Sequence, residues 1–173
     1  MPGPQYLDLY GVISATQLMF RRLRQFAALN ANEKLLILHA WWLLGYIRAA
    51  TLSIPFKHLT ASLQHHRQKV SPVSLDSKEL EQAARIGKLV STASKYTPWH
   101  TPCLTQVLVV QRLLCRRGIP GQFYLGVRKG GAKTGESDDL EAHAWLQCDN
   151  LIVSGGVGCQ DFAVLSTYSW GRS

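Results

Sequence analysis

The sequence predicts an α+β fold, with a mostly helical N-terminal region over residues 1–95 and a smaller core of helix and antiparallel sheet over residues 96–173. Two observations predict it. Apolar residues recur at helical spacing before residue 96, and three short β-like runs follow a single helical pattern after it. A chain of 173 residues is long enough for one domain with a buried core, so we expect one compact unit.

The N-terminal region contains several helical patterns. The apolar run LLILHAWWLLGYI, residues 35–47, is predicted to be a buried core helix. Its thirteen residues would cover about 20 Å, less than the ~30 Å of a membrane's hydrocarbon core, so no transmembrane segment is predicted. Residues 17–29 and 77–96 are predicted amphipathic helices, the second capped by Ser77. Residues 57–77 are expected to form a helix followed by an exposed connector.

The C-terminal part changes pattern. Residues 104–118 have a helical period and end in Arg-Arg-Gly, a typical C-terminal signal. The predicted strands that follow are 122–128, 142–148 and 151–155. Asp149 and Asn150 are expected to form a two-residue hairpin turn between the last two strands.

Charge is concentrated in the first part of the chain. Residues 1–102 carry 12 basic and 5 acidic side chains, net +7, whereas residues 103–173 carry 7 and 6, net +1. A basic region can meet nucleic acid, an anionic membrane surface or an acidic polypeptide. No basic–aromatic stripe or nucleic-acid module accompanies the charge, so no nucleic-acid partner is predicted.

All four cysteines lie in residues 103–173, and the first twenty residues lack a charged region ahead of their apolar stretch. We therefore predict no signal peptide, reduced thiols and a cytoplasmic location. The cysteines lack the close spacing of zinc ligands, and the adjacent His65 and His66 point in different directions on a helix. No glycine-rich phosphate motif occurs. Neither a metal nor a cofactor is predicted.

Cys103 is the strongest candidate for a catalytic nucleophile. It follows Thr101-Pro102 and opens the predicted helix. The first turn of a helix has unpaired N–H groups and a positive dipole end, which favour a thiolate nucleophile and can hold an oxyanion. A buried structural cysteine is the competing interpretation.

His143 strengthens this interpretation. It lies in the predicted strand AHAWLQC, where residues 143, 145 and 147 share one face. A cysteine at a helix start and a histidine on a following strand are the arrangement that a thiolate–imidazolium nucleophile requires. Taken alone, His143 would more often be a core histidine with its hydrogen bonds satisfied.

The sequence around Cys103 and His143 resembles a known family. The run CLTQVLVVQRLLCRRGIPGQFYLGVRKGG…LEAHAWLQCDNLIVSGG resembles the transglutaminase-like cysteine peptidases of lasso-peptide biosynthesis, which include the peptidase part of the microcin-processing B protein. The matching features are the Cys-Leu helix opening, the Arg-Arg-Gly-Ile-Pro exit and the His-Ala-Trp strand. The resemblance is specific over residues 99–156 and looser over 20–60.

The resemblance implies a transglutaminase-like or papain-like core and removal of a leader peptide from a ribosomally made precursor. It implies Cys103 as the nucleophile and His143 as general base and acid. It also implies two protein partners: a leader-recognition protein acting in trans, and an ATP-dependent macrolactam cyclase that acts afterwards.

This sequence departs from the family at the third catalytic residue. The family has an aspartate on the strand after the histidine strand. With a turn at 149–150, residue 143 should pair opposite Gly156, where no carboxylate stands. Asp149 is expected at the hairpin tip, about 20 Å from His143 at strand rise. Asp161 is the preferred candidate, and a backbone carbonyl is the alternative.

Two other functions remain open at this stage. The same Cys–His pair can transfer an acyl group to an amine instead of water. A non-enzymatic adaptor that binds a peptide through its basic half is the second alternative.

Overall fold

The computed structural model describes residues 30–66, 73–130 and 140–172. The chain divides into two compact units, residues 1–36 and 37–173, and of the first only residues 30–36 are described. The helix predicted over 17–29 and most of the loop between the first two predicted strands lie outside the described residues.

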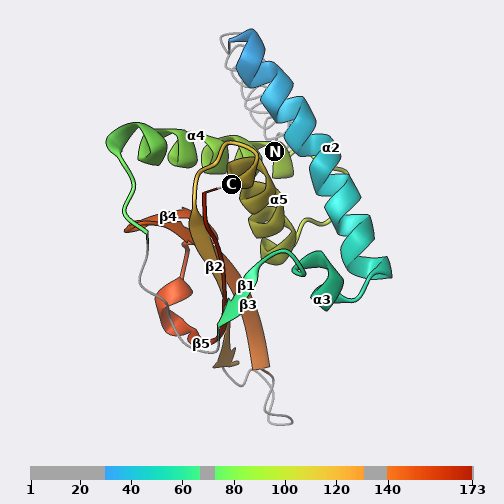
Figure 1. The fold of residues 1–173 in the computed structure, drawn as a ribbon. Helices are drawn as coiled ribbons and strands as arrows, with labels where there is room; N and C mark the ends of the chain where they lie inside the picture. The colour runs from blue at the N-terminus through green and yellow to red at the C-terminus, as the bar shows by residue number, and fades with distance from the viewer. Residues whose placement is uncertain (1–29, 67–72, 131–139, 173) are drawn as a thin grey trace, which may run out of the picture. The chain divides into compact units, whose positions relative to one another are not determined.

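Helices and an antiparallel sheet make up the described chain (Figure 1). The sheet has five strands in the order β1-β5-β2-β3-β4, so the predicted α+β fold is confirmed. The helices are α2 (Ala31–Ser53), α3 (Phe56–Leu59), α4 (Ser77–Ser94), α5 (Cys103–Cys115) and the 3-10 helix η1 (Cys159–Asp161). The strands are β1 (Gln64–His66), β2 (Gly121–Lys129), β3 (Leu140–Cys148), β4 (Leu151–Ser154) and β5 (Ala163–Trp170).

Helix α2 differs from the prediction in length and burial. It has 23 residues, and by length and composition alone it is apolar enough to cross a membrane. Only one face is buried, through Ala40, Leu44, Ile47 and Ala50, while Leu38, Trp42 and Tyr46 on another face are exposed. The apolar run suggested burial on all sides, but neighbouring elements cover only one. The prediction of a core helix is therefore correct for one face and wrong for the other.

Two strands were not predicted. The helix expected within 57–77 is the single turn α3, and residues 64–66 form β1 at the sheet edge. There His65 pairs with Tyr168 of β5, and the two rings lie 4.9 Å apart. Strand β5 pairs on its other side with β2. Both strands depend on partners far away in sequence, so local patterning carried little signal for them.

Helix α4 is capped one residue earlier than predicted. Asp76, not Ser77, is the N-cap, and its carboxylate accepts a hydrogen bond from the Glu79 N–H at 2.7 Å. The Glu79 carboxylate in turn accepts from the Asp76 N–H at 3.1 Å, which completes a capping box.

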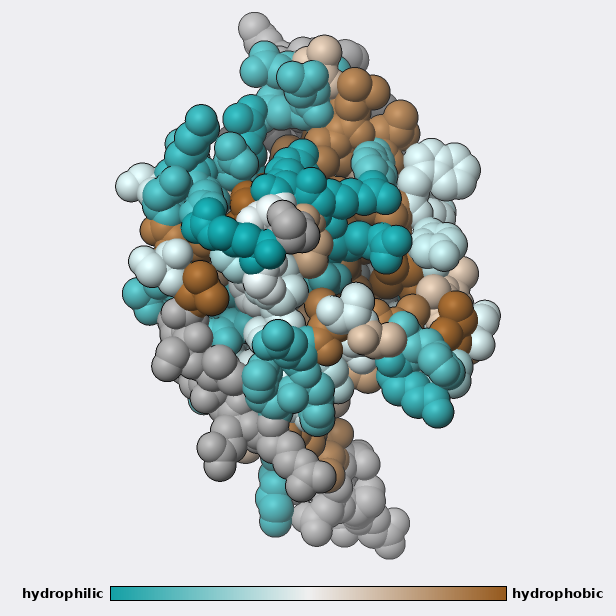
Figure 2. Space-filling view, in the orientation of Figure 1, coloured by the Kyte–Doolittle hydropathy of each residue, from teal (hydrophilic) through white to brown (hydrophobic). Residues whose placement is uncertain are grey.

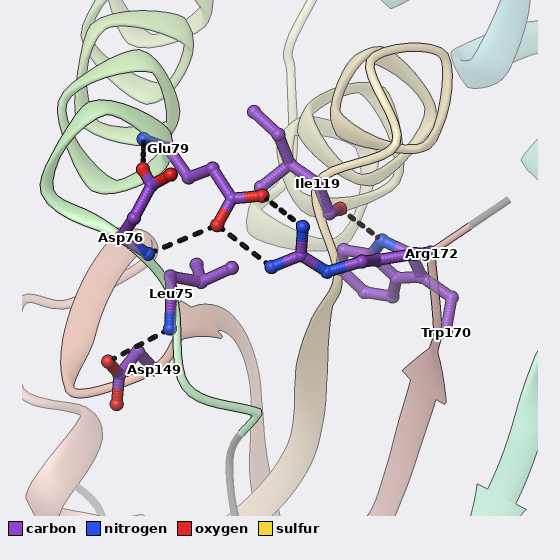
Figure 3. Close-up of polar contacts among 7 residues, drawn as sticks. All are labelled: Leu75, Asp76, Glu79, Ile119, Asp149, Trp170 and Arg172. Atoms are coloured by element: carbon purple, nitrogen blue, oxygen red, sulfur yellow. Dashed lines mark hydrogen bonds and ion pairs between the residues drawn. The ribbon is translucent and has the colours of Figure 1, made fainter.

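The start of α4 is tied to the end of the chain (Figure 3). Glu79 forms an ion pair with Arg172 at 2.8 Å. Just before it, the Trp170 indole N–H donates to the Ile119 carbonyl at 2.9 Å, in the turn between α5 and β2. Asp149 at the β3–β4 turn accepts from the Leu75 N–H at 3.4 Å. These contacts fix the end of the sheet that is remote from His143.

The capping box yields a stability prediction. Asp76→Ala should lower the free energy of unfolding by about 1 kcal/mol, because the Glu79 N–H loses its acceptor. Thermal denaturation followed by circular dichroism measures this loss. Ser77→Ala is the control and should change stability by less than ~0.5 kcal/mol. Equal losses in both variants would contradict the assignment of Asp76 as the cap.

Candidate active site

Cys103 is the first residue of α5 and is half-buried. Pro102 precedes it in an extended conformation at the N-cap position, where no side chain caps the helix. The first hydrogen bond of the helix runs from the Gln106 N–H to the Pro102 carbonyl at 3.2 Å. The N–H groups of the first turn before Gln106 therefore have no acceptor within the helix, and they are available to an anion.

The segment leading to Cys103 is held by hydrogen bonds. The Thr97 hydroxyl lies 2.9 Å from the Thr101 hydroxyl and 3.0 Å from the Trp99 carbonyl, to which it can donate. The Gln106 side-chain amide donates to the Thr101 carbonyl at 3.2 Å. The Trp99 ring packs on Trp41 of α2, with centroids 5.0 Å apart. This turn thus fixes where α5 begins.

The other end of α5 also follows the prediction closely. The helix ends at Cys115, and Gly118 adopts a left-handed φ of 67°. The Ile119 N–H reaches back to the Leu114 carbonyl at 3.1 Å, as in a helix C-terminal motif. Strand β2 then runs back along α5 (Figure 1).

His143 lies on β3 opposite Gly126 of β2. Its Nε2 is 2.8 Å from the Gly155 carbonyl oxygen. Because a carbonyl only accepts, this hydrogen bond requires the proton on Nε2 and leaves the lone pair of the neutral ring on Nδ1. The ring also lies against Phe162 and Trp145, with centroid distances of 5.0 and 6.1 Å.

Gly155 is placed by an irregularity that the simple hairpin did not predict. The β3–β4 register shifts between Leu146 and Gln147, so Leu146 pairs with Ser154. The expected pairing of residue 143 with Gly156 is therefore wrong. Gly155 follows with a φ of 70°, and a Cβ there would lie 2.3 Å from the Ala144 carbonyl oxygen. Only glycine fits this turn, which aims the carbonyl at His143.

Counted from the turn between α5 and β2, Cys103 and Gly126, the residue opposite His143, are at similar distances along their elements. Cys103 is twelve residues before the end of α5, about 18 Å along the helix axis. Gly126, opposite His143, is five residues into β2, about 17 Å from its start. Within the residues that the structure describes, no hydrogen bond joins the Cys103 sulfur to the His143 ring. Catalytic hydrogen bonds often shorten only when substrate is bound.

Asp161 is linked to His143 through two other side chains, Arg128 and Phe162. Its carboxylate is exposed and lies 3.7 Å from the Arg128 guanidinium, which also pairs with Glu141. Arg128 stacks over the Phe162 ring at 4.7 Å, and that ring contacts His143. Asp149, the other carboxylate considered, binds the Leu75 N–H instead. Of the two orienting groups expected from sequence, the backbone carbonyl is the one in contact with His143.

Burial works against two of the remaining cysteines as nucleophiles. Burial raises the pKa of Cys148 to about 12. Burial also raises the pKa of Cys115, whose sulfur accepts from the Gln111 amide at 3.1 Å. Cys159 is buried beside Tyr124 and Trp145. Among the described residues, no three His, Cys, Asp or Glu side chains gather in a way that suits a metal ion.

These pKa shifts predict the order of thiol alkylation. A thiol with a pKa near 12 is about one part in ten thousand thiolate at pH 8, and this fraction rises only as the pH approaches 12. Iodoacetamide should therefore label the half-exposed Cys103 long before Cys148 in the folded protein. Peptide mass spectrometry measures the two rates. Comparable labelling rates of Cys103 and Cys148 in the folded protein would contradict this order. Comparable rates are expected only after denaturation.

Comparison with known proteins adds to the site. The model of the Transglutaminase-like superfamily matches residues 50–167, more than half of the chain. The chain belongs to the transglutaminase-like superfamily. The match spans α4, α5 with Cys103 at its start, β3 with His143, and η1 with Asp161. Searches of curated proteins and of solved structures found no match.

Membership in the transglutaminase-like superfamily supports a papain-like cysteine peptidase or acyltransferase fold in general, because the superfamily generally contains Cys-His-Asp enzymes. Sequence reasoning named Cys103 and His143 but missed Gly155 as the group that contacts the histidine. The available signal was a Gly-Gly pair directly after a strand, where a positive φ is common.

Proposed function

We propose that this chain is a cysteine endopeptidase that removes the leader peptide from a ribosomally made lasso-peptide precursor. The observation that carries the proposal is His143, whose Nε2–H is held by the Gly155 carbonyl so that Nδ1 is left as the base, in a chain whose α5 starts at Cys103. The superfamily supports Cys–His chemistry in general. The resemblance described above supports the precursor as substrate.

The first half of the reaction forms a thioester. Nδ1 of His143 takes the proton from the Cys103 thiol, and the thiolate attacks the carbonyl carbon of the scissile peptide bond. The N–H groups of the first turn of α5 stabilise the resulting oxyanion. As the C–N bond breaks, the imidazolium returns its proton to the departing amine of the core peptide.

The second half hydrolyses the thioester. Nδ1 takes a proton from water, the hydroxide adds to the thioester carbonyl, and the C–S bond breaks to release the leader with a new carboxylate. The proton held on His143 restores the thiol. Throughout, Gly155 keeps the ring in one tautomer and orientation, the task that a carboxylate performs in other triads.

Asp161 is proposed as a positioning residue instead of a direct partner of His143. Its charge acts on Arg128, and the Arg128 guanidinium covers the Phe162 ring that packs on the histidine. All three of these side chains are at least partly exposed, so the ion pair is screened by water. Its contribution to the rate is therefore expected to be small.

The proposal also includes the two protein partners that the resemblance implies. A separate leader-recognition protein presents the precursor, and an ATP-dependent macrolactam cyclase then uses the freed amine. That cyclase joins the amine to a side-chain carboxylate, so cleavage must come first.

The test is mass spectrometry of the precursor after incubation with this protein and the leader-recognition protein. Hydrolysis yields two fragments whose masses add up to the precursor plus one water. Cys115→Ala is the matched control, since Cys115 lies at the far end of the same helix, and it should still cleave. Fragments joined to another amine would instead indicate an acyl transferase. An intact precursor would refute the proposal.

A further inference from the structure

Helix α2 exposes an apolar face to solvent. Leu38, Trp42 and Tyr46 are 56%, 67% and 65% exposed, and their spacing of four residues puts them on one side of the helix. We call these three side chains the α2 stripe. Figure 2 shows hydrophobic surface gathered along the course of α2. Contiguous exposed apolar patches on a protein surface mark protein or membrane interaction sites.

The stretch of sequence that contains the stripe carries charge of one sign. The sequence between Glu33 and Asp76 contains no acidic residue, but it holds five Lys or Arg residues and four His. Lys57 and His58 form the exposed basic end of α3, directly after α2. An acid-free interval of this length favours an anionic partner.

A cavity lies between α2, α3 and α5 and is continuous with the stripe at Tyr46. It has a volume of about 250 Å³. Ile54 and Leu108 contribute apolar walls, whereas Arg112, Gln111 and His58 supply hydrogen-bond donors. No carboxylate is among the described residues that line it. The cavity is therefore suited to an anionic group attached to an apolar chain.

We propose that the α2 stripe docks on the surface of an anionic phospholipid membrane, with the cavity beside Tyr46 receiving a lipid phosphate. Trp and Tyr side chains favour the membrane–water interface, and a basic surround favours anionic lipids. The helix lies on the membrane and does not cross it, because Ala40, Leu44, Ile47 and Ala50 on its other side are buried in the protein. This inference is independent of the proposed peptidase activity.

The test is flotation of the full-length protein with vesicles of phosphatidylcholine alone or mixed with phosphatidylglycerol. We expect binding to the mixed vesicles, weaker binding at high salt, and little binding to phosphatidylcholine alone. Leu38→Ser/Trp42→Ser should weaken partitioning by about tenfold or more because it removes apolar area from the stripe. Lys57→Glu/Arg112→Glu should also weaken it about tenfold.

Matched controls separate docking from general surface effects. Leu165→Ser removes an exposed leucine from β5, away from α2, and should bind as the unchanged protein does. Lys78→Glu/Lys88→Glu reverses two charges on α4 and changes the net charge equally. Circular dichroism establishes that each variant is folded.

Two outcomes would overturn the proposal. One is no flotation with the mixed vesicles, and the other is an equal loss of vesicle binding in the control and test variants. A dimer in analytical ultracentrifugation that Leu38→Ser/Trp42→Ser abolishes, without vesicle binding, would instead assign the stripe to a second copy of the chain.

Discussion

Cys103→Ala and His143→Ala should each reduce precursor cleavage by about 10³-fold or more, and the double variant should be no slower than either single one. The reason is that thiolate and imidazole act as one unit: without Nδ1 the thiol keeps its proton, and without the sulfur no thioester forms. Single-turnover rates of leader release, measured with the leader-recognition protein present, give these ratios.

The control for this prediction is the set of other cysteines. Cys115→Ala and Cys148→Ser should cleave at nearly the normal rate, since burial raises the pKa of both thiols and disfavours their thiolates. Circular dichroism should show that Cys103→Ala is folded, because Cys103 is only half-buried at the start of its helix. Cleavage retained in Cys103→Ala and lost in Cys115→Ala would move the nucleophile to the other end of α5 and refute the mechanism.

Elements with strong local signals could be predicted from the sequence. Helix α5 was found because its apolar period, the arginines at its end and Gly118 all agree. Strands β2 and β3 were found from dense apolar runs, and Asp149 does form the turn after β3, with a φ of 51°. In each case the residues that determine the conformation are within a few positions of it.

Elements that depend on distant partners could not be predicted in the same way. Strand β1 has only three residues and exists because β5 pairs with it across about a hundred residues of sequence. The exposure of Trp42 and Tyr46 depends on which neighbours cover α2, which the apolar run itself does not encode.

The candidate site shows the same division. Cys103 and His143 carry their chemistry in their identity and could be singled out from sequence. The partner of His143 could not, because a backbone carbonyl has no residue type. Its position follows from the register shift between β3 and β4 and from the left-handed conformation of Gly155.

The role of that carbonyl leads to the second large effect. Gly155→Ala should reduce the rate of cleavage by about 10²-fold or more. A Cβ at this position would lie 2.3 Å from the Ala144 carbonyl oxygen, and the φ of 70° disfavours any side chain. The backbone must therefore move, and His143 Nε2 loses its acceptor. A histidine that is free to rotate or change tautomer presents Nδ1 to the thiol for less of the time.

Three measurements distinguish a lost orientation from a lost fold. Gly156→Ala is the matched control, because a Cβ there meets only the Ile152 side chain, at 3.0 Å, and this variant should stay active. In Gly155→Ala, the ¹⁵N chemical shifts of His143 should show a mixture of tautomers, and kcat should fall more than KM rises. Asp161→Asn should remain nearly as active as the unchanged protein, since its carboxylate touches Arg128 and not the histidine. Normal cleavage by Gly155→Ala together with an inactive Asp161→Asn would return the orienting role to the carboxylate.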